Sequence, residues 1–300
     1  MVSGVLAEPR RDRLAQSLVT ARRTLDTAHV DDRVSRSGTE GCRVGYSISG
    51  HGPVVMLLHS SVSGRRQWRA LVDALDERYT MVTVDLIGYG ETPPWEAERP
   101  QRLTDQSALV HELAEQIGSP LALVGHSFGG SVALCAAAEL GGRLAGLILL
   151  EPNPFGLLQA ANQAEFAEVW ALRNAVKQAG LSGDWDGAAK RFADYWNGAG
   201  SWAAMSEQRR RLFADALRPN YHEWDAAVGA PVRDYVAAVR AQTSVTCARD
   251  TVTPIATIVT LLQERRPDWR FIWLEHGGHM APLSRPELVN PIVAAALDQL

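Results

Sequence analysis

A serine flanked by glycines is the clearest candidate for chemistry in this chain. Ser127 lies in Gly125-His126-Ser127-Phe128-Gly129, after four apolar residues and before an alanine-rich run. That order predicts a buried strand, a very tight turn and a helix. Glycines on both sides suit a strained turn, because neither position then carries a Cβ. The spacing therefore predicts a nucleophilic serine at the tip of a strand-to-helix turn.

A serine nucleophile needs a base, and the base needs a carboxylate that orients it. His279 follows an apolar run and a Gly-Gly pair, and Asp250 follows the strand predicted for 243–248. The resulting order of serine, aspartate and histidine is the one that accompanies this kind of turn. We therefore predict Ser127, Asp250 and His279 as the catalytic residues.

The elements that must position these residues alternate between strand and helix. Apolar or alternating runs predict strands at 43–49, 53–59, 80–85, 144–150, 243–248 and 270–274, besides the one formed by the four apolar residues before Gly125. Strands joined by helices form a parallel sheet through right-handed crossovers, and ligands bind at the carboxyl ends of such strands. All three predicted catalytic residues fall at that edge. The fold class is therefore α/β.

The alternation stops between 152 and 229, where the pattern is helical and holds five of the nine tryptophans. An insertion at this edge of the sheet would cover the site, so we predict a helical cap there. The core is then 41–151 and 230–300. Residues 1–40 are predicted to be a helical extension, because Leu14, Leu18, Ala21 and Leu25 recur at helical spacing.

The composition limits the kinds of partner and cellular location that are expected for this chain. The net charge of −4 gives no reason to expect nucleic acid as a partner. Three cysteines without metal-ligand spacing favour reduced thiols in a cytoplasm, and no apolar run is long enough for a membrane span. A small-molecule substrate is the expected partner, and the sequence leaves a homodimer open. The predominance of arginine over lysine favours a bacterial source.

Over residues 40–300, the chain resembles the α/β-hydrolase fold superfamily. The resemblance rests on His59 with its small-residue loop, Asp85-x-x-Gly88-x-Gly90, the Ser127 motif, Asp250 before Thr253-Pro254, and Gly278-His279. It implies an eight-stranded, mostly parallel sheet with a cap after the sixth strand. It also implies hydrolysis without a metal or an organic cofactor.

The resemblance also decides between rival residues. His276 precedes the Gly-Gly pair, whereas similar proteins place the base after it, so His279 is preferred. Glu151 is the rival acid, because some relatives carry the carboxylate after the sixth strand. Asp250 is preferred because it occupies the commoner position. His59 and Asp85 are expected to be structural.

An oxyanion hole is expected from two backbone N–H groups. One belongs to Phe128, the residue after the nucleophile, and by resemblance the second belongs to Ser61. Ser60 replaces the usual glycine after His59, so a positive φ there would strain the backbone. Residues that we expect to line the substrate pocket are Ser60, His126, Asn153 and Trp196, although packing is the expected main role of His126.

These features predict a serine hydrolase that acts through an acyl-enzyme. The aromatic cap favours a small apolar metabolite with an ester, lactone or thioester bond, and a carbon–carbon bond is a further option. Two alternatives stay open: a biosynthetic lyase or cyclase that uses the same site, and a ligand-binding protein of this fold without turnover. Epoxide hydrolases and haloalkane dehalogenases are disfavoured, because those relatives need a carboxylate at position 127.

Overall fold

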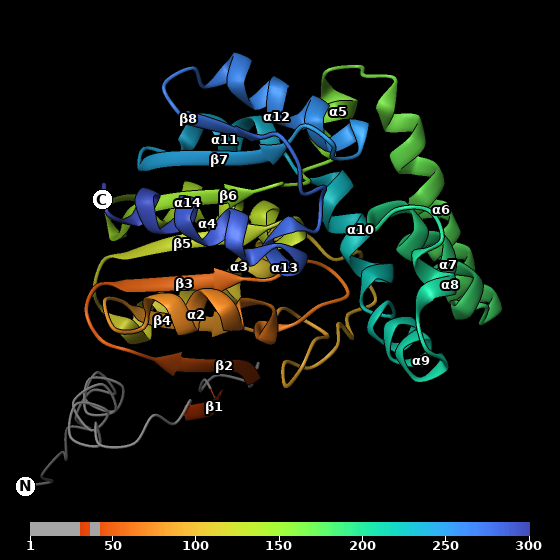
Figure 1. The fold of residues 1–300 in the computed structure, drawn as a ribbon, viewed down its shortest axis with the longest axis horizontal. Helices are drawn as coiled ribbons and strands as arrows, with labels where there is room; N and C mark the ends of the chain where they lie inside the picture. The colour runs from red at the N-terminus through yellow and green to blue at the C-terminus, as the bar shows by residue number, and fades with distance from the viewer. Residues whose placement is uncertain (1–30, 37–42) are drawn as a thin grey trace, which may run out of the picture.

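The computed structural model describes residues 31–36 and 43–300, which form an eight-stranded sheet covered by helices (Figure 1). The strands are β1 (Asp31–Arg36), β2 (Arg43–Ser49), β3 (Val54–Leu58), β4 (Thr80–Val84), β5 (Leu121–His126), β6 (Leu144–Leu150), β7 (Gln242–Ala248) and β8 (Arg270–Leu274). They lie in the order β1-β2-β4-β3-β5-β6-β7-β8. Strand β2 is antiparallel to both neighbours, and the other pairs are parallel. The predicted α/β fold is confirmed.

Helices cover both faces of the sheet. Those outside the long insertion are η1 (Arg65–Trp68), α2 (Arg69–Leu75), α3 (Leu103–Ile117), α4 (Phe128–Leu140), η2 (Gly141–Arg143), α11 (Val232–Ala238), α12 (Thr253–Arg265), α13 (Ala281–Ser284) and α14 (Pro286–Leu297). Helices α2 and α14 pack on one face, and α3, α4 and α11 pack on the other (Figure 1).

The apolar run of β3 shows why the sheet is buried on both faces. Side chains alternate along a strand, so Val55 and Leu57 join the core under α2 and α14, while Met56 and Leu58 join the core on the α4 side. Each is at most 1% exposed. Burying one such side chain stabilises the fold by about 1.5–3 kcal/mol. The central strands are thus firmly placed, and so are the loops at their carboxyl ends.

The segment 152–229, called the cap below, carries six helices between β6 and β7. They are α5 (Gly156–Ala160), α6 (Glu165–Ser182), α7 (Trp185–Trp196), α8 (Ser201–Ala204), α9 (Glu207–Ala216) and α10 (Asn220–Gly229). Figure 1 shows α6 to α10 beside the carboxyl ends of the parallel strands. The side chain of Asp184 accepts a hydrogen bond from the Gly187 N–H and so fixes where α7 begins.

The predicted helical extension is wrong where the structure describes it, because 31–36 form β1. This strand pairs with β2 along its whole length, from Asp31 opposite Ile48 to Arg36 opposite Arg43. The helix predicted around residues 14–25 lies outside the described residues. Within 31–36 and 43–300, no helix combines the length and the apolar character that crossing a membrane requires.

Candidate active site

Ser127 occupies a strained turn between β5 and α4, as the glycine spacing predicts. Its φ of 54° and ψ of −117° lie outside the regions that non-glycine residues favour. A Cβ on Gly125 would lie 2.4 Å from the Gly129 carbonyl oxygen, and one on Gly129 would lie 2.3 Å from the Leu58 carbonyl oxygen. Both glycines are therefore required for the close approach of strand and helix, which presents the serine at the sheet edge.

The base predicted from the sequence contacts the serine. His279 Nε2 lies 2.9 Å from Ser127 Oγ, and His279 Nδ1 lies 3.2 Å from Glu151 Oε2. All three residues are buried. Because a carboxylate can only accept, Nδ1 carries the proton and Nε2 is free to accept the serine proton. This is the arrangement of a nucleophile, a base and an orienting acid.

The prediction that Asp250 partners His279 is wrong in this geometry. Asp250 is exposed, and its carboxylate accepts hydrogen bonds from the N–H groups of Gly278 at 2.8 Å and Gly277 at 3.1 Å. Partial burial acts to raise the pKa of Asp250, but these two donors outweigh it and hold that pKa below its usual range. Asp250 thus fixes the loop that carries His279, but it does not contact the imidazole ring of His279.

Glu151 is fixed tightly at the end of β6. Its φ is 48°, an uncommon value for a residue other than glycine. Its carboxylate also accepts hydrogen bonds from the Ala248 N–H and the Thr251 hydroxyl. The acid is therefore held by β7 and the loop after it. Thr251 has no sequence signal of its own and was not predicted.

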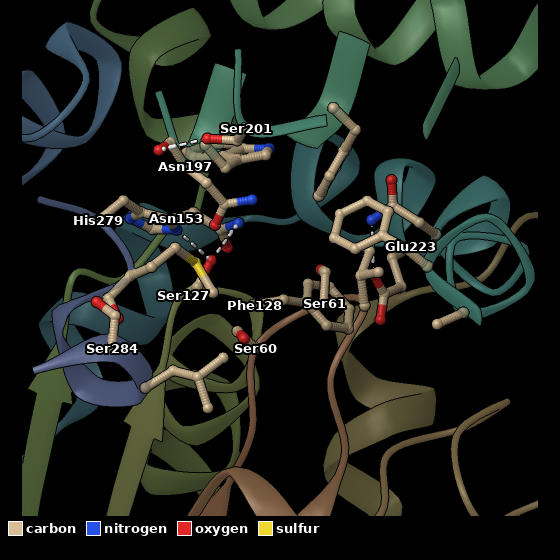
Figure 2. Close-up of a pocket in the computed structure, with 18 of the residues that line it drawn as sticks. Ser60, Ser61, Ser127, Phe128, Asn153, Asn197, Ser201, Glu223, His279 and Ser284 are labelled. Atoms are coloured by element: carbon tan, nitrogen blue, oxygen red, sulfur yellow. Dashed lines mark hydrogen bonds between the residues drawn. The ribbon is translucent and has the colours of Figure 1, made fainter. Parts of the chain in front are cut away.

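Two further side chains contact the reacting pair, and Figure 2 shows one of them, Asn153, beside Ser127. Asn153 Nδ2 lies 3.3 Å from Ser127 Oγ, and Asn153 Oδ1 accepts a hydrogen bond of 2.9 Å from Ser131. Trp196 of α7 covers the imidazole of His279, with 4.4 Å between ring centroids. The cap thereby shields the base from solvent.

His126 supports the site from behind. Its Nε2 lies 2.9 Å from the carbonyl oxygen of His279, and its Nδ1 lies 3.0 Å from Gln67 Nε2. Gln67 Oε1 in turn accepts from the N–H and the hydroxyl of Ser60. Burial, followed by the charge of His279, holds the pKa of His126 well below its usual range. A neutral His126 can thus donate through Nε2 and accept at Nδ1, which joins the Ser60 loop to the His279 loop. Sequence reasoning missed Gln67.

The loop after β3 has the strain expected at Ser60, but two residues further on, at Val62. Ser60 has no positive φ, whereas Val62 has a φ of 58°. This is unfavourable for a β-branched residue, and the hydrogen bond from the Val62 N–H to the Tyr89 hydroxyl at 3.0 Å helps to hold it. Because Ser60 is bonded to Gln67, the glycine usual at this position is not needed for the turn.

His59 and Asp85 are structural in their contacts, as expected. The Leu86 N–H donates to His59 Nε2 at 3.0 Å, so Nδ1 carries the proton and donates to the Ser60 carbonyl at 2.7 Å. Burial lowers the pKa of His59 and favours this neutral form. Asp85 pairs with Arg65 and accepts a hydrogen bond from the Glu91 N–H.

The two expected oxyanion donors come from different elements, the start of α4 and the loop after β3. Phe128 is the first residue of α4, where the N–H groups of a helix lack intrahelical acceptors and the helix dipole favours negative charge. Ser61 and Phe128 both line the cavity that contains Ser127 (Figure 2). Their backbone N–H groups have no hydrogen-bond acceptor in the described part of the chain.

A cavity of about 810 Å³ lies between the sheet edge and the cap. It contains Ser127 and His279, and three of the four expected pocket residues line it: Ser60, Asn153 and Trp196. The expectation for His126 as a pocket residue is wrong, because its ring is fully buried between Gln67 and His279 and does not reach the cavity. In 31–36 and 43–300, no cluster of three or more His, Cys, Asp or Glu could hold a metal.

Glu223 of α10 is an unpredicted acid in the cavity wall. It is 2% exposed, and its Oε2 accepts a hydrogen bond of 2.7 Å from Asn220. Burial raises the pKa of Glu223 to about 7, although the nearby Ser61, Asn220 and Tyr89 side chains act in the opposite direction. A lone glutamate in a helical pattern gives no signal that it will be buried, so sequence reasoning missed it.

This raised pKa predicts a pH dependence of stability. The folded state keeps the Glu223 proton up to a pH of about 7, while the unfolded chain loses it near 4.5. The contribution of this group to the free energy of unfolding therefore falls as pH rises through that window, by on the order of 3 kcal/mol. Urea unfolding across the window should show a smaller fall for Glu223→Gln than for the unmodified protein. Equal falls would contradict the raised pKa of this acid.

Comparison with known proteins agrees with this fold. The model of the alpha/beta hydrolase family matches residues 54–292. The chain belongs to this family. The match begins at β3 and ends within α14, so it includes all the strand ends that carry the candidate site.

Related proteins in the family differ in their named activities. A pimeloyl-[acyl-carrier protein] methyl ester esterase of Aeromonas hydrophila is 28% identical over 260 residues, which are 81% of this chain and 95% of that protein. A soluble epoxide hydrolase of a Corynebacterium is 31% identical, but the match covers 41% of this chain and 42% of that protein. A protein phosphatase methylesterase 1 of Mus musculus is 32% identical over 44% of this chain and 35% of that protein.

Solved structures share the fold at low identity. An esterase from Exiguobacterium antarcticum superposes with a TM-score of 0.75 at 18% identity, covering 89% of this chain and 100% of that one. A bromoperoxidase from Bacillus anthracis superposes with a TM-score of 0.74 at 20% identity, with the same coverage. At these identities, the similarity to the two structures shows a shared fold.

Proposed function

We propose that this alpha/beta hydrolase is a serine hydrolase that cleaves an ester, lactone or thioester bond through an acyl-enzyme. The observation that carries the proposal is the hydrogen-bonded series from Ser127 through His279 to Glu151, with distances of 2.9 and 3.2 Å. A serine hydroxyl 2.9 Å from a neutral imidazole nitrogen has a base at the distance that proton transfer requires.

Acylation uses each of these groups once. Ser127 Oγ attacks the substrate carbonyl carbon while His279 Nε2 takes its proton. Glu151 holds the Nδ1–H and stabilises the imidazolium that forms. His279 then returns the proton to the leaving oxygen or sulfur, and the carbon–leaving-group bond breaks.

The negative charge on the carbonyl oxygen needs donors that are already in place. The N–H groups of Phe128 and Ser61 are suited to this role, because both border the cavity beside Ser127 and have no acceptor in the described chain. One such donor contributes about 3 kcal/mol in the transition state. Val62, the residue after Ser61, holds the strained φ of 58°, and we infer that this strain keeps the Ser61 N–H directed at the cavity.

Deacylation reverses the proton movements. A water molecule takes the place of the leaving group, His279 removes its proton, and the oxygen attacks the acyl carbon. Ser127 then leaves with the proton returned by His279. The water oxygen ends in the released acid.

Ester chemistry fits this chain better than epoxide opening. Two of the similar proteins are named as methyl esterases and one as an epoxide hydrolase. Epoxide opening in this superfamily needs a carboxylate at the position of Ser127, and a serine there favours attack on a carbonyl group instead. The serine at position 127 therefore favours an activity like that of the ester-cleaving relatives over epoxide opening.

Hydrolysis in ¹⁸O-labelled water tests the proposal. A panel of 4-nitrophenyl esters of rising chain length first identifies an ester that is turned over. Mass spectrometry of the products should then find the label in the acid and none in the phenol. Turnover without label in either product would support a lyase or cyclase, and the absence of turnover with every ester would support a ligand-binding protein.

A further inference from the structure

The part of the cavity wall that the cap forms holds buried polar atoms without a hydrogen-bond partner among the described residues. Four buried atoms without a hydrogen-bond partner belong to cap residues that line the cavity: Trp196 Nε1, Asn220 Oδ1, Glu223 Oε1 and Trp224 Nε1. Unpartnered buried polar atoms are rare in folded proteins, because each one costs free energy. Several such atoms in one cavity wall indicate groups that form hydrogen bonds to a ligand when it is bound.

Two of these atoms are acceptors on side chains that touch each other. Asn220 Nδ2 donates to Glu223 Oε2 at 2.7 Å, so the free Asn220 Oδ1 and Glu223 Oε1 belong to one hydrogen-bonded pair. Ser61 and Tyr89 approach the same carboxyl group but do not complete a hydrogen bond to Oε1. In Figure 2, Ser61 lies between Ser127 and Glu223. The pair thus lies beyond the expected oxyanion donor, as seen from the nucleophile.

The charged residues around Asn220 and Glu223 indicate which kind of ligand can bind there. Glu223 is the one carboxylate among the described residues that line the cavity, and no ion pair to it occurs in residues 43–300. The cations of α6, Arg173 and Lys177, pair instead with Asp225. Arg209 lines the cavity from α9 but is exposed. Among the described residues, therefore, none supplies a cation that pairs with Glu223.

A primary ammonium group matches these atoms. It carries three donors and no acceptor, so it can bond Glu223 Oε1 and Asn220 Oδ1 together. Phe155 and Trp224 line the same cavity, and aromatic rings attract a cation at a face that no other ring covers. A carboxylate, by contrast, repels an anionic substrate terminus, and the free Asn220 Oδ1 has no proton to donate to one.

We propose that Glu223 and Asn220 form a specificity site for an ammonium group at the far end of the substrate. This inference rests on the proposed function, since it assigns a substrate class to the same cavity. The scissile carbonyl lies at Ser127, and the chain of the substrate runs past Ser61 to the cap. The substrate class is thus an ester or thioester with a cationic amine on one side of the scissile bond.

Three series of ethyl esters test this site, matched in chain length and ending in ammonium, methyl or carboxylate. We expect a kcat/KM about 10–100-fold higher for the best ammonium ester than for its methyl analogue, as for a hydrogen bond to a charged group. In Glu223→Gln this ratio should fall to within about threefold of unity. The matched control is Glu207→Gln, which removes an exposed cap acid paired with Arg211 and should keep the ratio.

Binding gives a second readout that does not need turnover. An n-alkylammonium chloride should raise the melting temperature of the unmodified protein and of Glu207→Gln, but not that of Glu223→Gln. An unchanged ester ratio in Glu223→Gln, or a preference for the methyl series in the unmodified protein, would overturn the inference and leave the proposed function standing. If no ester is hydrolysed, the proposed function fails, and the melting temperatures alone decide on the ammonium site.

Discussion

Replacing Ser127 with alanine is expected to lower kcat for ester hydrolysis by at least about 10,000-fold. The hydroxyl is the atom that would bond to the substrate, and no other hydroxyl lies within hydrogen-bond distance of His279 Nε2 in the described chain. The variant should fold, because the side chain is small and donates to no structural partner. Stopped assays of the best nitrophenyl ester measure the loss, and thermal unfolding checks the fold.

Ser284→Ala is the matched control for this variant. Ser284 lines the same cavity, but its hydroxyl donates to the Met280 carbonyl and has no histidine partner. Its kcat should stay within about tenfold of the unmodified protein. If Ser127→Ala keeps activity of that size as well, Ser127 is not the nucleophile.

The second large effect is expected at Glu151. In Glu151→Gln, kcat should fall by about 1,000–10,000-fold, because an amide NH₂ directed at His279 favours the wrong imidazole tautomer. In Asp250→Asn, the fall should be less than about tenfold, because Asp250 bonds the Gly277 and Gly278 N–H groups and not the imidazole. Steady-state kinetics of both variants, with the same ester, give the comparison.

The ranking of these two variants is the informative result. A larger loss in Asp250→Asn than in Glu151→Gln would mean that the acid lies after β7 and that the contact of 3.2 Å between Glu151 and His279 has no catalytic role. Thr251→Val is a further check, because it removes a hydroxyl that bonds Glu151. It should lower kcat less than Glu151→Gln does, since the carboxylate remains.

The nucleophile turn could be predicted because its signal is local. Ser127 needs a strand before it, a helix after it and a glycine on each side, and all of these are neighbours in the sequence. The apolar runs also place β6 and β8 at 144–150 and 270–274, as the structure has them. Local patterns of this kind do not depend on how distant segments pack.

The partner of His279 depended on such packing, and the expected contact between Asp250 and His279 was wrong. Glu151 and Asp250 both follow parallel strands at one edge of the sheet, so spacing alone does not separate them. The two N–H groups of Gly277 and Gly278 draw Asp250 away from the imidazole, and a left-handed backbone aims Glu151 at it. Neither feature has a signature in the sequence.

The cap shows the same limit. Its aromatic content predicts a cover for the site, but the burial of Glu223 depends on how α10 lies against the loop of Ser61. Gln67 likewise becomes important through contacts with Ser60 and His126 that lie 7 and 59 positions away in the sequence. Side chains that act through distant partners are the ones that sequence reasoning missed.

Intact-mass spectrometry after treatment with a fluorophosphonate tests the central claim most directly. Phosphonylation requires a serine activated by a base, which is what the contact of 2.9 Å between Ser127 and His279 implies. The proposed mechanism predicts a single adduct, located on the peptide that contains Ser127, absent in Ser127→Ala and much slower to form in Glu151→Gln. A folded protein that forms no adduct, or an adduct that persists in Ser127→Ala, would contradict it.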